Sequence, residues 1–129
     1  MGQVEIYSHS EKGYKTMFSF GAWRIGMLRE DERFIHLTYL ERHCLSDEAF
    51  ALLAGRAVLV THEADGYVFT LMEPEKVYNI PKGLWHNIYV DPNAVVIIAE
   101  NSETGRENSE YEPFDMRDFP EEIRRKIRP

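Results

Sequence analysis

Cysteine is almost missing from this sequence of 129 residues, which contains a single one, Cys44. One cysteine cannot form a disulfide within the chain, and no cysteine-rich metal cluster can be built from it. We therefore expect a protein of a reducing compartment, the cytoplasm. By alternation along its strand Cys44 lies opposite His43, so a small packing residue is expected there.

Long apolar runs are also missing. None approaches the roughly 20 residues needed to span a bilayer, and the first ten residues, MGQVEIYSHS, lack the basic and apolar regions of a signal peptide. No membrane partner is expected. The sequence also has no G-x-S-x-G element and no phosphate-binding glycine loop, so it gives no sign of these two kinds of site.

Basic residues are in the minority, with 15 Lys and Arg against 22 Asp and Glu and a formal net charge of −7. Phosphate backbones are bound by clusters of Lys and Arg, so this balance argues against a nucleic-acid partner. The one basic concentration, RRKIR, follows Glu121 and Glu122. Acid first and base last is the order that complements the dipole of a helix.

Short segments rich in β-branched and aromatic residues fill most of the chain. Turn-forming pieces such as EADG, PKG and DPN separate them, which favours a β-sandwich or small barrel over βαβ units. The length suits one domain spanning 1–129. The expected strands lie within 14–20, 22–29, 34–43, 50–62, 66–73, 76–81, 85–90 and 94–101.

The end of the chain has a different pattern. Residues 102–110, SETGRENSE, form a polar segment that we expect to be an exposed loop. In FPEEIRRKIR, Pro120 stands at the first helical position and acidic residues follow it, which predicts a short C-terminal helix over 119–128.

The segment FIHLTYLERH, residues 34–43, places charged groups where a core is expected. Its odd-numbered residues from Ile35 to Tyr39 are apolar and share one face of a strand, and Glu41 and His43 continue that face. A buried charge is costly unless it is paired or coordinated. Either the strand has left the core by residue 41, or the interior there is a site.

Two later segments repeat this pattern. Glu48 shares a face with Phe50, and His86 shares one with Ile88. Two imidazoles and two carboxylates at interior positions near strand ends suit a borderline or hard divalent ion such as Zn, Fe, Mn or Ni. The candidate ligands are Glu41, His43, Glu48 and His86.

Two motifs contain these four residues: E-x-H-x4-E-x6-G at 41–55 and P-x-G-x2-H at 81–86. The pair is similar to the signature motifs of the cupin superfamily, G-x5-H-x-H-x3–4-E-x6-G and G-x5-P-x-G-x2-H-x3-N. The matching residues are His43, Glu48, Gly55, Pro81, Gly83 and His86. The resemblance covers strands from about residue 15 to residue 101.

The resemblance implies a small single-domain cupin, an all-β double-stranded β-helix or jelly-roll barrel, with a divalent transition metal at its mouth. It also implies a homodimer, for which sheet edges and the N-terminal strand offer a route. The sequence departs from the motifs at Ile35, Glu41, Glu75 and Val90. Glu41 keeps a ligand type in place of histidine but adds negative charge, which favours harder ions and leaves room for a site without metal.

Three functions stay open. The first is a metal-dependent enzyme of isomerase or lyase type that acts on a sugar or a hydroxy or keto acid, with Glu41 and Glu48 as catalytic residues; a dioxygenase is its variant. The second is a non-catalytic module that binds or senses a small ligand. The third is a structural protein in which His43 and His86 are hydrogen-bonded core residues and the acids pair with Arg42, Arg56 or Lys82.

Overall fold

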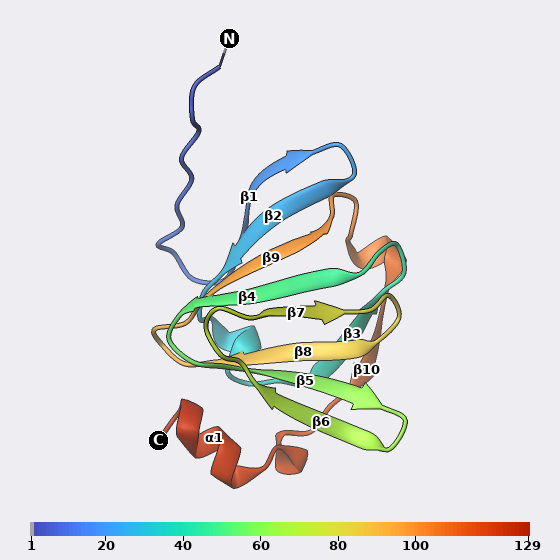
Figure 1. Cartoon of the computed structure of the whole chain (residues 1–129). Coiled ribbons are helices and arrows are strands. Elements are labelled where there is room, and N and C mark those ends of the chain that lie inside the picture. The colour runs from blue at the N-terminus through green and yellow to red at the C-terminus, as the bar shows by residue number, and fades with distance from the viewer. Residues whose placement is uncertain (1) are drawn as a thin grey trace.

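Two antiparallel sheets of five strands pack face to face in the computed structural model, which describes residues 2–129 (Figure 1). Sheet A has the order β1 (Tyr14–Phe20), β2 (Trp23–Leu28), β9 (Val95–Asn101), β4 (Glu48–Ala54), β7 (Val77–Ile80). Sheet B has the order β10 (Ser109–Pro113), β3 (Tyr39–His43), β8 (Trp85–Val90), β5 (Ala57–Glu63), β6 (Gly66–Leu71). The expected all-β class is confirmed.

The main core lies between the two sheets. In β9, and in β4 as far as Leu52, every second residue is buried, as the period-two pattern of these segments predicts. Phe50 and Ile98 from sheet A pack in one cluster with Leu59, Ile88 and Val90 from sheet B. This packing fixes which face of each strand points inward, and therefore which polar residues lie between the sheets.

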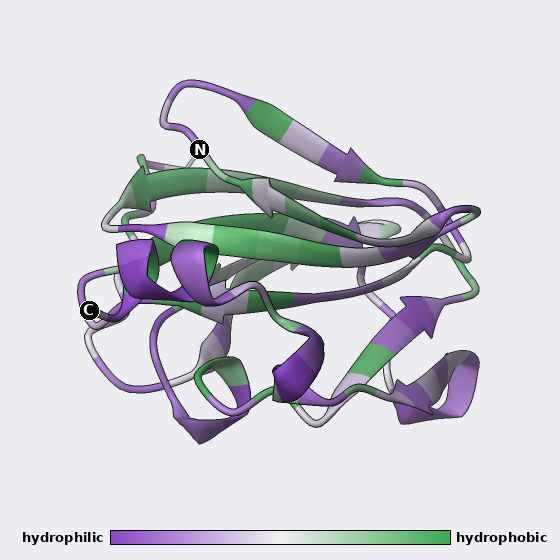
Figure 2. Cartoon of the chain, turned by 90° about the horizontal axis from the view of Figure 1, so that it is seen from below, coloured by the Kyte–Doolittle hydropathy of each residue, from purple (hydrophilic) through white to green (hydrophobic). Residues whose placement is uncertain are grey.

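Sheet B is also covered on its outer side. The C-terminal helix α1 (Glu121–Ile127) and the turn before it, η3 (Met116–Asp118), lie against this sheet (Figure 2). Leu40 and Val60 of the sheet pack there with Phe114, Phe119 and Ile127. The short C-terminal helix is confirmed, although Pro120 is its N-cap residue and not its first helical residue. Within residues 2–129 no helix combines the length and the hydropathy that crossing a membrane requires.

The segment 34–43 differs from its prediction as a continuous strand. A 3-10 turn, η1 (Glu32–Phe34), precedes it, with the Asp31 carboxylate accepting a hydrogen bond from the backbone of Arg33. The strand β3 begins only at Tyr39, and Leu37 packs in the outer cluster beside Leu40. Leu37 therefore lies on the side of sheet B opposite Glu41, because the turn breaks the alternation.

The polar segment 102–110 is not simply an exposed loop. It contains a 3-10 turn, η2 (Arg106–Asn108), and Thr104 within it is buried. Its last two residues begin β10, which pairs with β3 in the register Ser109↔His43. β10 contains few apolar residues, so a hydrophobicity pattern does not reveal it. The strand is defined by its backbone pairing with β3.

Two of the turn positions with a left-handed backbone differ in that glycine occupies only one of them. Gly55 joins β4 to β5 at φ +71°, and a Cβ there would lie 2.4 Å from the backbone nitrogen of Ala94. Glu75, at the motif position usually held by glycine, also has a positive φ of 70°. It is the one residue other than glycine with this backbone in 2–129, and a side chain there is strained.

We predict that Glu75→Gly stabilises the protein by about 1 kcal/mol. Relief of roughly 1–2 kcal/mol of left-handed strain exceeds the extra backbone entropy that glycine loses on folding, roughly 0.5–1 kcal/mol. Urea unfolding measures the difference, and Glu75→Ala is the matched control because it keeps the strain. Equal midpoints for Glu75→Gly and the parent chain would contradict the prediction.

Candidate metal centre

A cavity of about 750 Å³ opens between the sheets, and all four candidate ligands line it. Glu41 and His43 come from β3, and His86 lies directly opposite Glu41 on the neighbouring β8. Glu48 begins β4 on the facing sheet. The fold thus brings together residues that are up to 45 positions apart in the sequence, as the alternation of apolar and polar residues predicts.

The two imidazoles point their Nε2 atoms at the same carboxylate oxygen. Glu48 Oε1 lies 2.8 Å from Nε2 of His86 and 3.1 Å from Nε2 of His43. Glu41 Oε1 lies 3.5 Å from Nε2 of His43. His43, Glu48 and His86 are all buried, whereas the side chain of Glu41 keeps 29% of its exposure and faces the cavity.

The other nitrogen of each ring, Nδ1, makes a hydrogen bond to the chain. Nδ1 of His86 lies 2.9 Å from the backbone carbonyl oxygen of Leu84, and Nδ1 of His43 lies 2.8 Å from Oγ of Ser109. A carbonyl oxygen can only accept, so Nδ1 of His86 carries a proton and donates it. Second partners of this kind fix the rings of metal-binding histidines and leave Nε2 free to coordinate.

The charges of this cluster are strongly coupled. Burial disfavours the charged form of His43, but its hydrogen bonds with Glu41 and Glu48 and their negative charges outweigh burial and raise its pKa to about 10. Burial alone would raise the pKa of Glu48, yet hydrogen bonds with both imidazoles hold it below its usual value. Without a metal, His43 is therefore protonated at neutral pH and offsets one of the two negative charges of Glu41 and Glu48.

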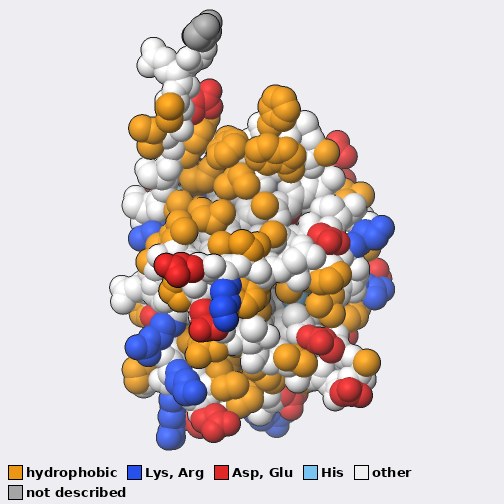
Figure 3. Space-filling view, viewed as in Figure 1, with side chains coloured by type: hydrophobic (Ala, Val, Ile, Leu, Met, Phe, Trp, Pro, Cys, Tyr) orange, Lys and Arg blue, Asp and Glu red, His pale blue; other side chains and the backbone are white. Residues whose placement is uncertain are grey.

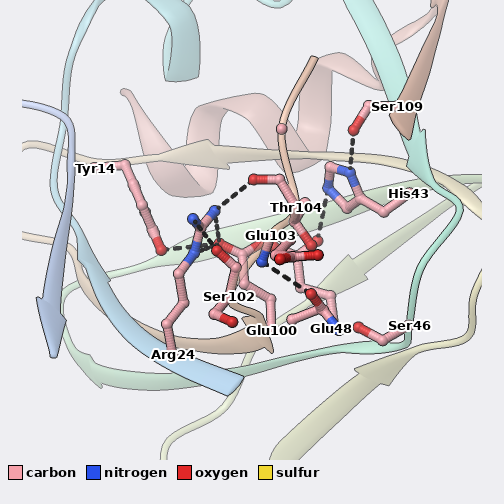
Figure 4. A network of polar contacts seen from close by, with 12 residues as sticks. Tyr14, Arg24, His43, Ser46, Glu48, Glu100, Ser102, Glu103, Thr104 and Ser109 are labelled. Carbon is pink, nitrogen blue, oxygen red and sulfur yellow. Dashed lines mark hydrogen bonds and ion pairs between the residues drawn. The ribbon is translucent and has the colours of Figure 1, made fainter. Parts of the chain in front are cut away.

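A third acid, Glu100 on β9, belongs to the same site and was missed from the sequence. Its Oε2 atom accepts hydrogen bonds from Tyr14 Oη at 2.8 Å and from Arg24 Nε and Nη2 at 3.1 and 2.9 Å (Figure 4). Burial and the charge of Glu48 raise the pKa of Glu100. The signal was present, because Ile98 and Glu100 alternate on the inward face of β9 as Phe50 and Glu48 do on β4.

The donor atoms fit a divalent ion. Glu41, His43 and His86 offer ligand atoms within 4.8 Å of one another, and so do His43, Glu48 and Glu100. Nitrogen and carboxylate oxygen donors suit borderline and hard divalent ions. Because Nδ1 of His86 already donates to Leu84, the 2.8 Å contact between its Nε2 and Glu48 needs a shared proton, and a cation can take that proton's place.

Two of the basic residues suggested as partners of the acids, Arg42 and Arg56, are engaged elsewhere. Arg42 pairs with Glu110 at 3.0 Å and lies over the ring of Trp85. Arg56 donates to the backbone of Lys126. Glu48 is instead held by the two histidines and Glu41 lies near His43, so ion pairing with Arg42 or Arg56 does not account for these two acids.

Aromatic and basic residues form the outer part of the cavity wall. Tyr39 and Tyr111 stack edge to face, with ring centroids 5.4 Å apart, and Arg33 lines the wall near them. The segment 102–110 contributes Arg106, so it borders the opening. Cys44 does not have the expected packing role, because it is exposed on the opposite side of β3.

The cluster predicts how the metal-free protein responds to pH. A pKa of His43 raised from 6.5 to about 10 contributes stability that is complete below pH 6.5 and is lost as pH rises through about 10. The lowered pKa of Glu48 contributes stability above its ordinary value of 4.5 and loses it as pH falls further. Within this cluster stability is therefore greatest between these two ordinary values.

The variant His43→Gln tests this dependence by urea unfolding of chelator-treated protein. The parent chain exceeds the variant in stability near pH 6, and the difference shrinks as pH rises from about 6.5 to about 10. His62→Gln, which removes an imidazole paired with Glu112 outside the cavity, serves as the control. A difference between parent and His43→Gln that stays constant with pH would refute the coupling.

Comparison with known proteins gives matches of structure only. No family model matches the chain, and no curated protein matches its sequence. A cupin-2 domain protein from Shewanella frigidimarina is 15% identical over 73% of this chain and 84% of its own, with a TM-score of 0.56. Streptomyces PAC13, solved with uridine, is 6% identical over 88% of this chain and 93% of its own, with a TM-score of 0.61.

A larger protein shares part of this architecture. The hydroxypropylphosphonic acid epoxidase from S. wedmorenis is 9% identical over 67% of this chain, with a TM-score of 0.53. The matched two thirds of this chain correspond to 49% of the epoxidase, about half of its length. A form of the epoxidase solved as Fe(II)-HppE matches with a TM-score of 0.52.

Proposed function

Starting from the cupin fold, which this chain has, we propose that the protein binds one divalent transition metal and acts on a polar or anionic small molecule in its cavity. The observation that carries this proposal is the pair of imidazoles. Both have Nδ1 anchored to the chain and Nε2 aimed at one point on the cavity floor.

His43 and His86 would hold the ion together with Glu48 and Glu41. Zn, Fe, Mn and Ni are the candidates, and the carboxylates favour the harder ions among them. When bound, such an ion acts as a Lewis acid toward a carbonyl or hydroxyl oxygen of the substrate. The exposed free thiol of Cys44 supports a reducing, cytoplasmic location.

The acids of the cavity are suited to moving protons. Isomerases and lyases of sugars and hydroxy acids remove a proton beside an oxygen-bearing carbon, and a carboxylate can accept it. Glu41 has the most open carboxylate of the cluster, whereas Glu48 Oε1 is already shared by two imidazoles. We therefore assign proton transfer first to Glu41 and a mainly positioning role to Glu48. Glu100 has Oε2 fully engaged by Tyr14 and Arg24, which leaves Oε1 as the oxygen for substrate contact.

The wall of the cavity supports a polar or anionic substrate. Its volume of about 750 Å³ lies within the roughly 300–1,000 Å³ typical of small-molecule sites. Acids and imidazoles occupy the floor, while Arg33 and Arg106 stand on the lining. A sugar acid, or a hydroxy or keto acid, matches this arrangement of charges. Its hydroxyl groups would face the acids, and its carboxylate would face Arg33 or Arg106.

A dioxygenase is the second candidate, favoured by the shared fold with the Fe(II) epoxidase. Two histidines and one carboxylate leave positions free on Fe(II) for such chemistry. A non-catalytic binding module is the third. Three outcomes separate these candidates. An isomerase or lyase turns over a sugar or hydroxy acid, a dioxygenase consumes dioxygen with Fe(II), and a binding module binds its ligand without either reaction.

Elemental analysis of protein purified without chelator or affinity metal tests the metal. We expect about one equivalent of a transition metal, and we expect His43→Ala combined with His86→Ala to abolish it while far-ultraviolet circular dichroism stays unchanged. The matched control removes two imidazoles that lie outside the cavity, His36→Ala with His62→Ala, and keeps the metal. Metal retained by the first double variant would overturn the assignment. A parent chain that stays empty after exposure to Mn, Fe, Ni and Zn would overturn it as well.

The charge of the substrate is tested at Arg106. Arg106→Ala is expected to weaken the binding of gluconate and related hydroxy acids about fivefold to tenfold, as loss of one partly solvated charge pair implies, and to leave glucose and metal content unchanged. Calorimetric titration measures both ligands. Arg117→Ala, whose side chain is 90% exposed outside the cavity, is the control. Equal losses for gluconate and glucose would contradict the anionic assignment.

A further inference from the structure

Arg24 is a charged residue on the inner side of sheet A. It lies directly opposite Glu100 in the pairing of β2 with β9, and both side chains line the cavity. The outer side of the same strands is hydrophobic, as the upper half of the space-filling view shows (Figure 3). The side chains of Arg24 and Glu100 are only 20% and 6% exposed. Because removing two charges from water costs free energy, a role beyond packing is expected for this pair.

The guanidinium of Arg24 does more than neutralise one acid. Its Nε and Nη2 atoms donate to Oε2 of Glu100. The same group also donates to two backbone carbonyl oxygens, from Nη1 to Ser102 at 3.3 Å and from Nη2 to Thr104 at 3.0 Å (Figure 4). A lysine could supply the charge, but its single nitrogen does not reproduce this planar fork. The arginine therefore attaches the segment 102–104 to sheet A.

The hairpin that carries Arg24 is shaped around this contact. The guanidinium lies over the ring of Tyr14, 5.9 Å from its centroid, and the Tyr14 hydroxyl donates to the same oxygen of Glu100 at 2.8 Å. Gly26 leaves the space for this ring, because a Cβ there would lie 2.2 Å from it. Three residues of β1 and β2 thus hold one carboxylate and one guanidinium in a fixed arrangement.

The segment attached by Arg24 continues into a closed turn that carries Arg106. The side chain of Asn108 donates to the backbone oxygen of Glu103 at 2.8 Å and accepts from the backbone nitrogen of Gly105 at 3.1 Å. Within residues 2–129 Arg106 makes no ion pair, although it lines the cavity. Its place is therefore set by the backbone of this turn, which is fixed at one end by Arg24 and at the other by the pairing of β10 with β3.

We propose that Arg24 is a positioning residue for the acidic end of the substrate, because it holds the segment 102–108 so that Arg106 stands at the cavity opening. This inference rests on the proposed function, since it takes the ligand to be an acid bound in the cavity. The guanidinium of Arg24 is already engaged by Glu100 and the backbone, so it does not bind the ligand itself. The site prefers an acid over a neutral sugar through Arg106, and Arg24 maintains that preference without touching the substrate.

The variant Arg24→Lys separates the two roles of the arginine, because it keeps a positive charge beside Glu100 and loses the fork that holds the segment. Calorimetric titration measures the preference for gluconate over glucose. We expect this preference to fall about fivefold, to the level of Arg106→Ala, and to fall no further when both changes are combined, since both act on one contact. A merely structural loss would weaken both ligands alike. The matched control Arg56→Lys, at an arginine that donates to the backbone of Lys126 away from the cavity, keeps the parent preference.

Trypsin cleavage after Arg106 tests the attachment of the segment without any ligand. A segment bound to sheet A opens rarely, so we expect slow cleavage in the parent chain and cleavage at least about tenfold faster in Arg24→Lys. Cleavage after Lys82, in the turn between β7 and β8, is the internal reference for global unfolding and keeps its rate. Asn108→Ala is the second variant, because it opens the turn without touching Glu100. It decides the question if Arg24→Lys fails to fold by circular dichroism.

An unchanged preference for gluconate in Arg24→Lys, or a further fall in the double variant, would overturn the proposal. Equal cleavage after Arg106 in the parent chain and the variant would overturn it as well. If the parent chain binds neither gluconate nor glucose, the proposed function fails, while the cleavage rates still decide whether Arg24 holds the segment. The two proposals can therefore fail separately.

Discussion

The structure depends most on the contact of two imidazoles with one buried carboxylate oxygen. His86 and His43 come from one sheet and Glu48 from the other, so their 2.8 and 3.1 Å contacts also join the two layers of the sandwich. Buried charge is tolerated there because each ionised group faces an opposite one or a fixed dipole. The Nδ1 anchors at Leu84 and Ser109 then leave the rings one orientation, which makes the site rigid before any ligand arrives.

The interior combines two polar clusters that share a boundary. One contains the imidazoles, and the other holds Glu100 between Tyr14 and Arg24. The guanidinium also donates to the backbone of Thr104 at 3.0 Å, so the second cluster ties the segment 102–110 to sheet A at the edge of the cavity. The acid that borders the candidate metal centre and the segment that borders its opening are therefore held by the same arginine.

Most of the fold and four of the five central site residues could be predicted from the sequence. Glu48 was found because β4 alternates and buries one side, and His86 was found because it shares a face with Ile88, although β8 is buried on both sides. The start of β3 was not predicted correctly. The turn capped by Asp31 breaks the alternation, so that Leu37 lies on the outer side of sheet B and not on the side of Glu41. The strand β10 was missed for another reason. Its place is determined by backbone pairing with β3, which leaves no hydrophobic pattern.

The position of Cys44 gives experimental access to the cavity. It is the chain's single cysteine, it is exposed, and it directly follows His43. Neighbouring residues of an extended chain point to opposite sides. A fluorophore attached to the Cys44 thiol would therefore lie outside the barrel, while the adjacent His43 lines the cavity. One label at a natural residue, with no engineered attachment point, would convert occupancy of the interior into an optical signal.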